Sequence, residues 1–465
     1  MNLEEKLRQL KKAAEKSPAE SELERQLEYL RRMGERSGAS QPSQPNGNGD
    51  ALRALPAQRA PSGIETYVDG SVQLNECGEF FLAQQALPFG RPYGKLRVAD
   101  FSSAGLSSLN LFLPGAALPD PSRLMFLDTE TTGLAGGTGT CAFLIGLGAI
   151  AGSQFVVRQY FLRDYPEERA MLKELSAKLA DCEGLVTFNG KTFDVPLLET
   201  RYALARLRSP FPRLVHLDLL HPARRMWKLR LASCALKNLE DELLGIHRQG
   251  DVDGSEIPGI YFDYLRTGDA RGLQTVFYHN ALDVISMAAL AVEMANVISE
   301  HSAAESPGVA PGTVHSLDLF SLSRIFERSG SAELSLSMCR KALEAGLPDE
   351  IETQALWQIA SQHKRKREHQ IAIEIWEEVT RRETSFAVRA FEELAIYYEH
   401  RARDAAKALE YAQGALNCIR SAGSAAGDNL GLRSMERLSH RMERLKKKVE
   451  QERARLNRAS LVARS

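Results

Sequence analysis

The chain lacks paired cysteines, a surplus of one charge and any long apolar run, and each absence excludes a class of protein. Its six cysteines stand singly, so zinc ribbons and disulfide-stapled secreted folds are not expected. The formal net charge is -1, so any contact with a polyanion has to be local. No apolar run approaches the ~20 residues that span a bilayer, and the amino terminus lacks a signal-peptide core. We therefore expect a cytoplasmic protein with no membrane partner.

Composition and patterning divide the chain into several segments. At 465 residues, 43% of them hydrophobic and 26% charged, it is long enough for about two to four domains. Leucines at helical spacing among charges predict an amphipathic helix over residues 1–36. The Ser-, Gln-, Pro- and Gly-rich stretch 37–62 is typical of a disordered linker. Residues 63–122 hold short strand-like pieces and form a lead-in segment to which the sequence assigns no chemistry.

Residues 123–299 are predicted to form an α/β domain, a mixed sheet flanked by helices. Apolar runs predict strands at 124–127, 143–149, 155–161, 185–188 and 215–217. Amphipathic stretches predict helices at 167–181 and 193–207, with more helices up to about residue 299. Three consecutive strands followed by alternating helices and strands are typical of such a mixed sheet.

A Ser- and Pro-rich link at 300–315 leads into a wholly helical pattern over 316–465 that ends in a charged helix. A repeat of about 35 residues runs through it. For example, Ala360 is echoed by Ala395, and Trp376 by Tyr411. Small residues where two helices cross, with large residues beside them, are typical of tetratricopeptide helix pairs. Such a helical-repeat tail is expected to dock a protein partner.

Four acidic residues stand at the expected ends or faces of elements in the α/β domain. Asp128 and Glu130 end an apolar strand, where residues two apart point to the same side. Asp194 opens a predicted helix. Asp283 lies within another helix, four residues after His279, so these two side chains share one helix face.

Each acidic motif alone also has an ordinary structural explanation. Asp128 and Glu130 can form a solvated strand end, and Asp194 can be a first-turn acid favoured by the helix dipole. All four in this order are harder to explain in that way. Oxygen-only ligands favour Mg²⁺ or Mn²⁺ over zinc. Two such ions about 3.5–4 Å apart activate water and stabilise both oxygens of an in-line phosphoryl displacement, so the pattern favours two-metal phosphodiester chemistry.

The segments FLDTETTGL, FNGKTFDVPLLETR and YHNALDVISM resemble the three motifs of DEDD-type 3′–5′ exonucleases of the ribonuclease H-like fold. The sequence between the second and third segments is similar to that of the YprB-like branch, and the resemblance covers residues 120–295. It implies a ribonuclease H-like fold and a 3′–5′ exonuclease that acts on single-stranded DNA or RNA at 3′ ends. It also implies that two Mg²⁺ or Mn²⁺ ions are bound by Asp128, Glu130, Asp194 and Asp283.

The residue expected to activate water departs from the superfamily's pattern. In that superfamily, a Tyr four residues before the last Asp, or usually a His five residues before it, orients or deprotonates the attacking water. Here His279 lies four residues before Asp283 and Tyr278 lies five before. Because residues four apart share a helix face, and because an imidazole titrates near neutrality, we expect His279 to be the general base.

Several further residues are expected to contact the substrate strand, although a solvated surface is the ordinary explanation for most of them. Candidates for binding its phosphates are Asn189, Lys191, Arg224, Arg225, Lys228 and, with them, Arg230. Asp218, at a strand end, is either a helix cap or a neighbour of the metal site. Core packing is the expected role of Phe193 and Trp227, with base stacking as the alternative.

Two other functions stay open at this point. One is a nucleic-acid-binding scaffold whose ribonuclease H-like domain is weak or inactive, although a binding domain has no need to crowd four carboxylates together. The other is a structure-specific endonuclease, because this fold supports several nucleic-acid reactions.

Overall fold

The computed structural model of the chain describes residues 63–102, 104–133, 139–302, 314–382, 384–421 and 429–462. The helix predicted for 1–36 and the linker predicted for 37–62 lie outside these residues, as does most of the link predicted for 300–315.

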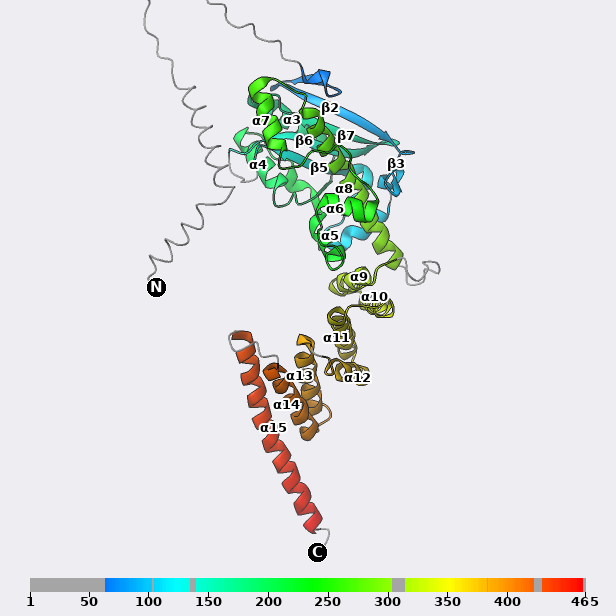
Figure 1. The fold of residues 1–465 in the computed structure, drawn as a ribbon, viewed down its shortest axis with the longest axis vertical. Helices are drawn as coiled ribbons and strands as arrows, with labels where there is room; N and C mark the ends of the chain where they lie inside the picture. The colour runs from blue at the N-terminus through cyan, green and yellow to red at the C-terminus, as the bar shows by residue number, and fades with distance from the viewer. Residues whose placement is uncertain are drawn as a thin grey trace, which may run out of the picture. The chain divides into compact units, whose positions relative to one another are not determined.

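Within the described residues, seven strands form one mixed sheet (Figure 1). Its order is β1 (Gly70–Asn75), β2 (Gly78–Pro88), β7 (Gln154–Phe161), β6 (Ala142–Ala151), β5 (Leu124–Thr131), β8 (Gly184–Thr187) and β9 (Val215–Asp218). Neighbours from β1 to β5 pair antiparallel, whereas β5, β8 and β9 are parallel. All five predicted strands are present, and the predicted α/β class with a mixed sheet is confirmed. A separate ribbon pairs β3 (Pro92–Tyr93) with β4 (Leu96–Arg97).

The lead-in segment 63–122 contributes more than short strands. β2 pairs with β1 on one side and with β7 on the other, and it buries Phe80, Phe81 and Leu87. The sheet of the α/β domain therefore extends back to Gly70. The same segment also forms 3-10 helices: η1 (Ile64–Thr66), η2 (Val98–Ser102), η3 (Ala104–Phe112) and η4 (Pro121–Arg123).

Helices flank the sheet, and both helices predicted by residue range are present. They are α3 (Glu168–Leu179), α4 (Asp194–Leu204), α5 (Leu220–Trp227), α6 (Leu236–Leu239), α7 (Ile257–Thr267) and α8 (Leu273–Ser302). Shorter turns are η5 (Tyr165–Glu167), η6 (Phe211–Arg213) and the π-helical turn η7 (Glu240–Leu244). By length and composition α8 could cross a membrane, but 72% of its most apolar stretch is buried inside the protein, which is how a core helix passes the same test.

Two glycines of β6 allow α8 to lie close against the sheet. A Cβ atom at Gly146 would collide with Asn280 and Val284, and one at Gly148 would come within 2.5 Å of Val284. Since real Cβ contacts are longer than this, larger residues at either position would push α8 outward. The close approach is what lets polar side chains of α8 reach the neighbouring strand β5.

The remainder of the described chain is helical, as predicted. Its helices are α9 (Ser316–Arg328), α10 (Ala332–Glu344), α11 (Asp349–Arg365), α12 (His369–Val379), α13 (Ser385–His400), α14 (Ala405–Ser421) and α15 (Asn429–Val462). Ala360, Ala372 and Trp376 are buried together in one apolar cluster. This agrees with small residues at helix crossings, while the tetratricopeptide assignment itself stays a prediction.

Candidate active site

The sheet topology brings the predicted carboxylates to one edge. β5 and β8 are parallel neighbours, with Phe126 opposite Val186, so both strands end at the same side of the sheet. Asp128 and Glu130 lie on the last half of β5. The chain leaves β8 through a short turn and reaches Asp194, the first residue of α4. α8, lying close to the sheet, contributes the fourth acid, Asp283.

Crowding raises the pKa values of three of these acids. The pKa of Asp128 lies well above its usual range because of burial first, and then because of repulsion from the other three carboxylates. Burial and repulsion from Asp283 and Asp194 raise the pKa of Glu130 to about 8. Burial is also the main cause that raises the pKa of Asp194 to about 6. The four predicted ligands therefore share one site and repel one another there.

A divalent cation fits the chemistry of this donor set. The four groups are carboxylates, which suit Mg²⁺ or Mn²⁺, and a bound cation would relieve their repulsion. Within the described ranges, however, no three Asp, Glu, His or Cys side chains converge as a finished coordination group. Two of the carboxylates face other partners, since Asp194 accepts a hydrogen bond from the Thr129 hydroxyl and Asp283 pairs with Arg248. These two side chains would have to turn in order to bind an ion.

A buried amide pair holds Asp128 in place. Asn280, fully buried on α8, donates from Nδ2 to Asp128 Oδ2 at 2.9 Å. Gln159 on β7 donates in turn to Asn280 Oδ1 at 3.0 Å and to the Phe277 carbonyl at 2.7 Å. Because Gln159 uses the Asn280 oxygen, the Asn280 amino group is left to face the carboxylate. Neither amide was predicted from the sequence, although Asn280 stands three residues before Asp283 and so lies near its helix face.

Asp218 acts as a cap and as an anchor for a turn. Its Oδ1 accepts from the Leu220 backbone N–H at 3.1 Å, at the start of α5. The same carboxylate accepts from the backbone N–H groups of Asn189 at 2.8 Å and Lys191 at 3.0 Å. Asn189 has a positive φ of 68°, and these bonds hold the turn that leads to Asp194. The cap interpretation is thus favoured, and Asp218 supports the site from behind.

His279 faces Asp283, as its spacing predicted. Its Nε2 lies 3.6 Å from Asp283 Oδ2, and its Nδ1 lies 2.9 Å from Asp251 Oδ1. Tyr278, in contrast, is 43% exposed. The geometry places an imidazole beside a predicted metal ligand, while its role as a general base stays a prediction.

A buried arginine lies behind these two groups. The Arg248 side chain is 2% exposed and reaches both oxygens of Glu240 at 2.6 Å, Asp251 at 3.1 Å and the Asp283 carboxylate. These neighbouring carboxylates raise the pKa of Arg248 even further above its usual range, although burial alone would lower it. Nothing in the sequence pointed to Arg248, Glu240 and Asp251, because η7 and the loop after it carry no local pattern that relates them to α8.

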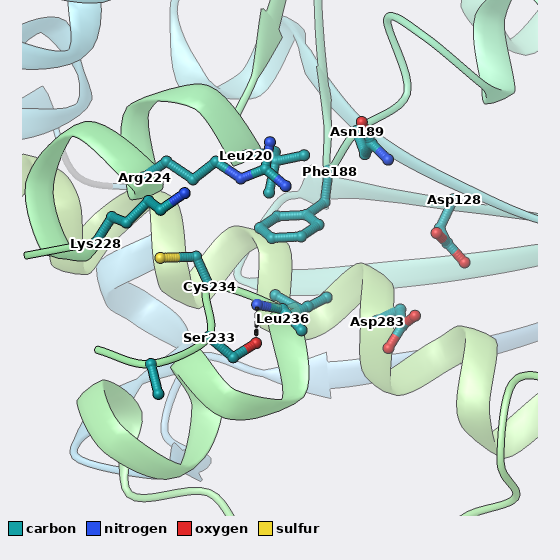
Figure 2. A pocket seen from close by; sticks show the side chains of 12 residues that line it. Asp128, Phe188, Asn189, Leu220, Arg224, Lys228, Ser233, Cys234, Leu236 and Asp283 are labelled. Carbon is teal, nitrogen blue, oxygen red and sulfur yellow. Dashed lines mark hydrogen bonds between the residues drawn. The ribbon is translucent and has the colours of Figure 1, made fainter. Parts of the chain in front are cut away.

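A pocket of about 540 Å³ opens beside the carboxylates (Figure 2). Asp128 and Asp283 line one part of it, and Arg224 of α5 and Lys228, the residue after α5, line another. The Phe188 ring lies between these two parts in the view of Figure 2. The same cavity is therefore lined by carboxylates, which can bind cations, and by basic side chains, which can bind an anion.

The other predicted contact residues are distributed differently. Asn189 also lines the pocket, whereas Lys191 and Arg225 are exposed but are not among its lining residues. Arg230 pairs with Asp318 of α9 at 2.8 Å. The prediction that Trp227 packs in the core is confirmed, since it is 2% exposed. The same prediction is wrong for Phe193, which is 54% exposed because it precedes α4 at the surface end of the turn.

The chain is similar to a family model, to a bacterial protein and to a solved polymerase structure. A family model described as RNase_H superfamily matches residues 125–295. The uncharacterized protein YprB of Bacillus subtilis is 32% identical over 329 residues, which is 70% of this chain and 75% of that protein. The solved family B DNA polymerase of the archaeon Pyrobaculum calidifontis matches 62% of this chain at a TM-score of 0.30 and 12% identity. The chain spans 34% of that polymerase, and a score this low is no guide to the fold. This chain therefore belongs to the YprB family and contains a domain of the ribonuclease H superfamily.

Proposed function

We propose that this protein is a metal-dependent nuclease, a 3′–5′ exonuclease that trims single-stranded DNA or RNA by two-metal-ion hydrolysis. The observation that carries the proposal is the carboxylate cluster of Asp128, Glu130, Asp194 and Asp283. A cluster that repels itself this strongly is costly to bury, and a ribonuclease H superfamily domain with cation-binding chemistry accounts for that cost.

Each residue of the site has a role in this proposal. The four carboxylates would hold Mg²⁺ or Mn²⁺, which would supply an activated water and stabilise charge on the scissile phosphate. His279 takes the proton of the attacking water at Nε2, the nitrogen that faces Asp283. Asn280 keeps Asp128 in one orientation, and Asp218 holds the turn that presents Asp194.

The pocket supports an anionic strand as the substrate. Arg224 and Lys228 are exposed bases that line the cavity shared with Asp128 and Asp283, and they are placed to hold phosphates. Phe188, in the same lining, offers a ring face to an unpaired base. A base can stack there only if it leaves its own duplex, which favours single-stranded ends. The 3′–5′ direction rests on the motif resemblance alone.

The helical region is proposed to bring the nuclease to a protein partner, and the protein is proposed to work in the cytoplasm. The repeat pattern is the basis for the first proposal, since stacked helix pairs expose an extended surface that suits protein docking. Single, unpaired cysteines are the basis for the second, because among the described residues all six cysteines are free thiols.

End-labelled substrates test the proposed activity directly. Single-stranded DNA and RNA, each labelled at the 5′ end, are incubated with Mg²⁺ or Mn²⁺ and the wild type, Asp128→Asn or wild type plus a chelator. A ladder that shortens from the 3′ end, absent in both controls, supports the exonuclease. Internal cuts at early times would instead indicate an endonuclease. Metal-binding protein without any cleavage would indicate a scaffold.

A further inference from the structure

Asp251 is a buried acid that has no part in the proposed metal site yet touches the proposed base. Its side chain is 3% exposed, in the loop between η7 and α7. Its Oδ1 lies 2.9 Å from His279 Nδ1, and its Oδ2 lies 3.1 Å from Arg248. A carboxylate buried this deeply is rarely tolerated without a specific partner.

These contacts decide which nitrogen of His279 carries a proton. A carboxylate that pairs with a guanidinium accepts hydrogen bonds and donates none. The His279 Nδ1 facing Asp251 must therefore carry the N–H, and the lone pair of the neutral ring lies at Nε2. Nε2 is the nitrogen that faces Asp283.

Arg248 ties this arrangement to the predicted metal ligand. One guanidinium contacts both Asp251, which holds the base, and Asp283, which belongs to the carboxylate cluster. Glu240, whose side chain is 0% exposed, holds Arg248 itself through two bonds of 2.6 Å. The distance between the base and the ligand is thus set by groups outside α8 as well as by the helix.

We propose that Asp251 is a positioning residue for His279, and that Arg248 holds Asp251 and Asp283 at a constant separation. The inference rests on the proposed nuclease function and deepens it. Asp251 holds the imidazole so that Nε2, and not Nδ1, receives the proton of the attacking water. Arg248 keeps the Asp283 carboxylate beside that nitrogen.

A double-mutant cycle in the full chain tests whether Asp251 acts through His279. The variants are Asp251→Asn, His279→Ala and the two combined, with Asp253→Asn, an exposed acid of the same loop, as the matched control. We expect Asp251→Asn to lower kcat about 100-fold, the lower limit of what a positioned general base contributes, and to leave KM nearly unchanged. In the His279→Ala background the same change should cost less than about threefold. An equal loss in both backgrounds, or no loss in the wild-type background, would overturn the proposal.

A spectroscopic measurement on the wild type tests the positioning without relying on activity. Protein labelled with ¹⁵N-histidine is examined by NMR at pH 8.5 with Mg²⁺, and the His279 signals are identified by their loss in His279→Ala. We expect a ring protonated at Nδ1 and unprotonated at Nε2. A ring protonated at Nε2, or at both nitrogens, would overturn the positioning role. If the wild type bound Mg²⁺ and showed this tautomer but cleaved nothing, the proposed function would fail while the positioning by Asp251 held.

Discussion

Two acidic sites in this molecule differ in how their negative charge is balanced. Glu399 of α13, with a side chain that is 0% exposed, accepts hydrogen bonds from Arg444 at 2.9 and 3.0 Å and from Lys448 at 3.0 Å, both on α15. Burial alone would raise its pKa, but these cations outweigh burial and lower the pKa to about 2. Glu130 of β5 is half-buried among other carboxylates, and desolvation with their repulsion raises its pKa to about 8.

The difference separates a structural ion cluster from a ligand cluster. At Glu399 the chain supplies the balancing cations itself, and the resulting ion pairs join α15 to α13. At Glu130 the chain supplies little balancing charge, chiefly that of Arg248. The missing positive charge has to come from outside, which is the physical basis for expecting metal ions there. Substitutions and pH changes that alter the balance of charge at either site test this difference.

Removal of Arg248 should have the largest effect, because among the described residues it is the main cation that compensates the ligand cluster. Arg248→Met leaves Glu240 and Asp251 buried without their cation, so we expect a loss of about 3–5 kcal/mol in the free energy of unfolding. Urea denaturation measures this loss. The exposed Arg169 provides the control, since Arg169→Met should change stability by less than about 0.5 kcal/mol. A similar small change for Arg248→Met would mean that the buried network contributes little.

Asp128→Asn should separate activity from stability. The variant removes one ligand charge but keeps a group that can bond to Asn280, so nuclease activity should fall about 10²–10³-fold. The metal-free protein should be as stable as the wild type or more stable, because a repelling charge is gone. Initial cleavage rates and thermal unfolding with chelator give the two readouts. Retention of full activity would remove Asp128 from the site.

The stability of the metal-free protein should fall as the pH rises. Because the pKa values of Asp194 and Glu130 are raised in the folded state, their protonated forms favour folding. That contribution is complete below the ordinary carboxyl range and is lost as the pH passes through about 6 and about 8. Mg²⁺ at 100 times its Kd should add about 2.7 kcal/mol. Its effect should be larger at pH 8 than at pH 5, because the ion competes with protons. Unfolding curves against pH, with Mg²⁺ and with chelator, measure both effects, and parallel curves would contradict this account.

Glu399→Gln should show the opposite dependence on pH. The lowered pKa means that ionised Glu399 stabilises the fold at pH values above its ordinary value of 4.5, and that this stability is lost as the pH falls towards about 2. At pH 7 we expect the variant to lose about 1.5 kcal/mol, the value of one charge-assisted hydrogen bond. The loss should shrink towards pH 3 and should not respond to Mg²⁺. A loss that depended on Mg²⁺ would connect this site to the metal cluster.

Lys228→Ala should have the smallest effect. A base that contacts phosphate contributes salt-dependent affinity, so KM should rise a few-fold and kcat should stay constant. The slope of log affinity against log salt should become shallower by about 1. Binding of a single-stranded oligonucleotide at several salt concentrations measures that slope, with Arg169→Ala as the control. An unchanged slope would place the substrate strand elsewhere.

Much of the α/β domain could be read from local patterns. Buried strands such as Leu124–Thr131 carry continuous apolar runs that end at a polar residue, so both the strand and the position of Asp128 are visible in the sequence. The strand β2 was harder to interpret, since its role depends on pairing with β7, far along the chain. Phe193 was misread for a related reason, because an aromatic residue beside a helix start is buried or exposed according to what packs over it.

The sequence by itself determined the order along the chain of the strands and helices in residues 123–299 and the helical pattern of residues 316–465. It also determined which four carboxylates are candidate metal ligands. Each of these features depends on residues that are close together in the chain. Only the tertiary structure decided that Arg248 faces Asp283, that Asp251 faces His279 and that Asn280 faces Asp128. These contacts join residues up to 152 positions apart. The contact of Asn280 with Asp128 also needs α8 to lie close against Gly146 of β6, and that closeness is a property of packing which no local pattern records.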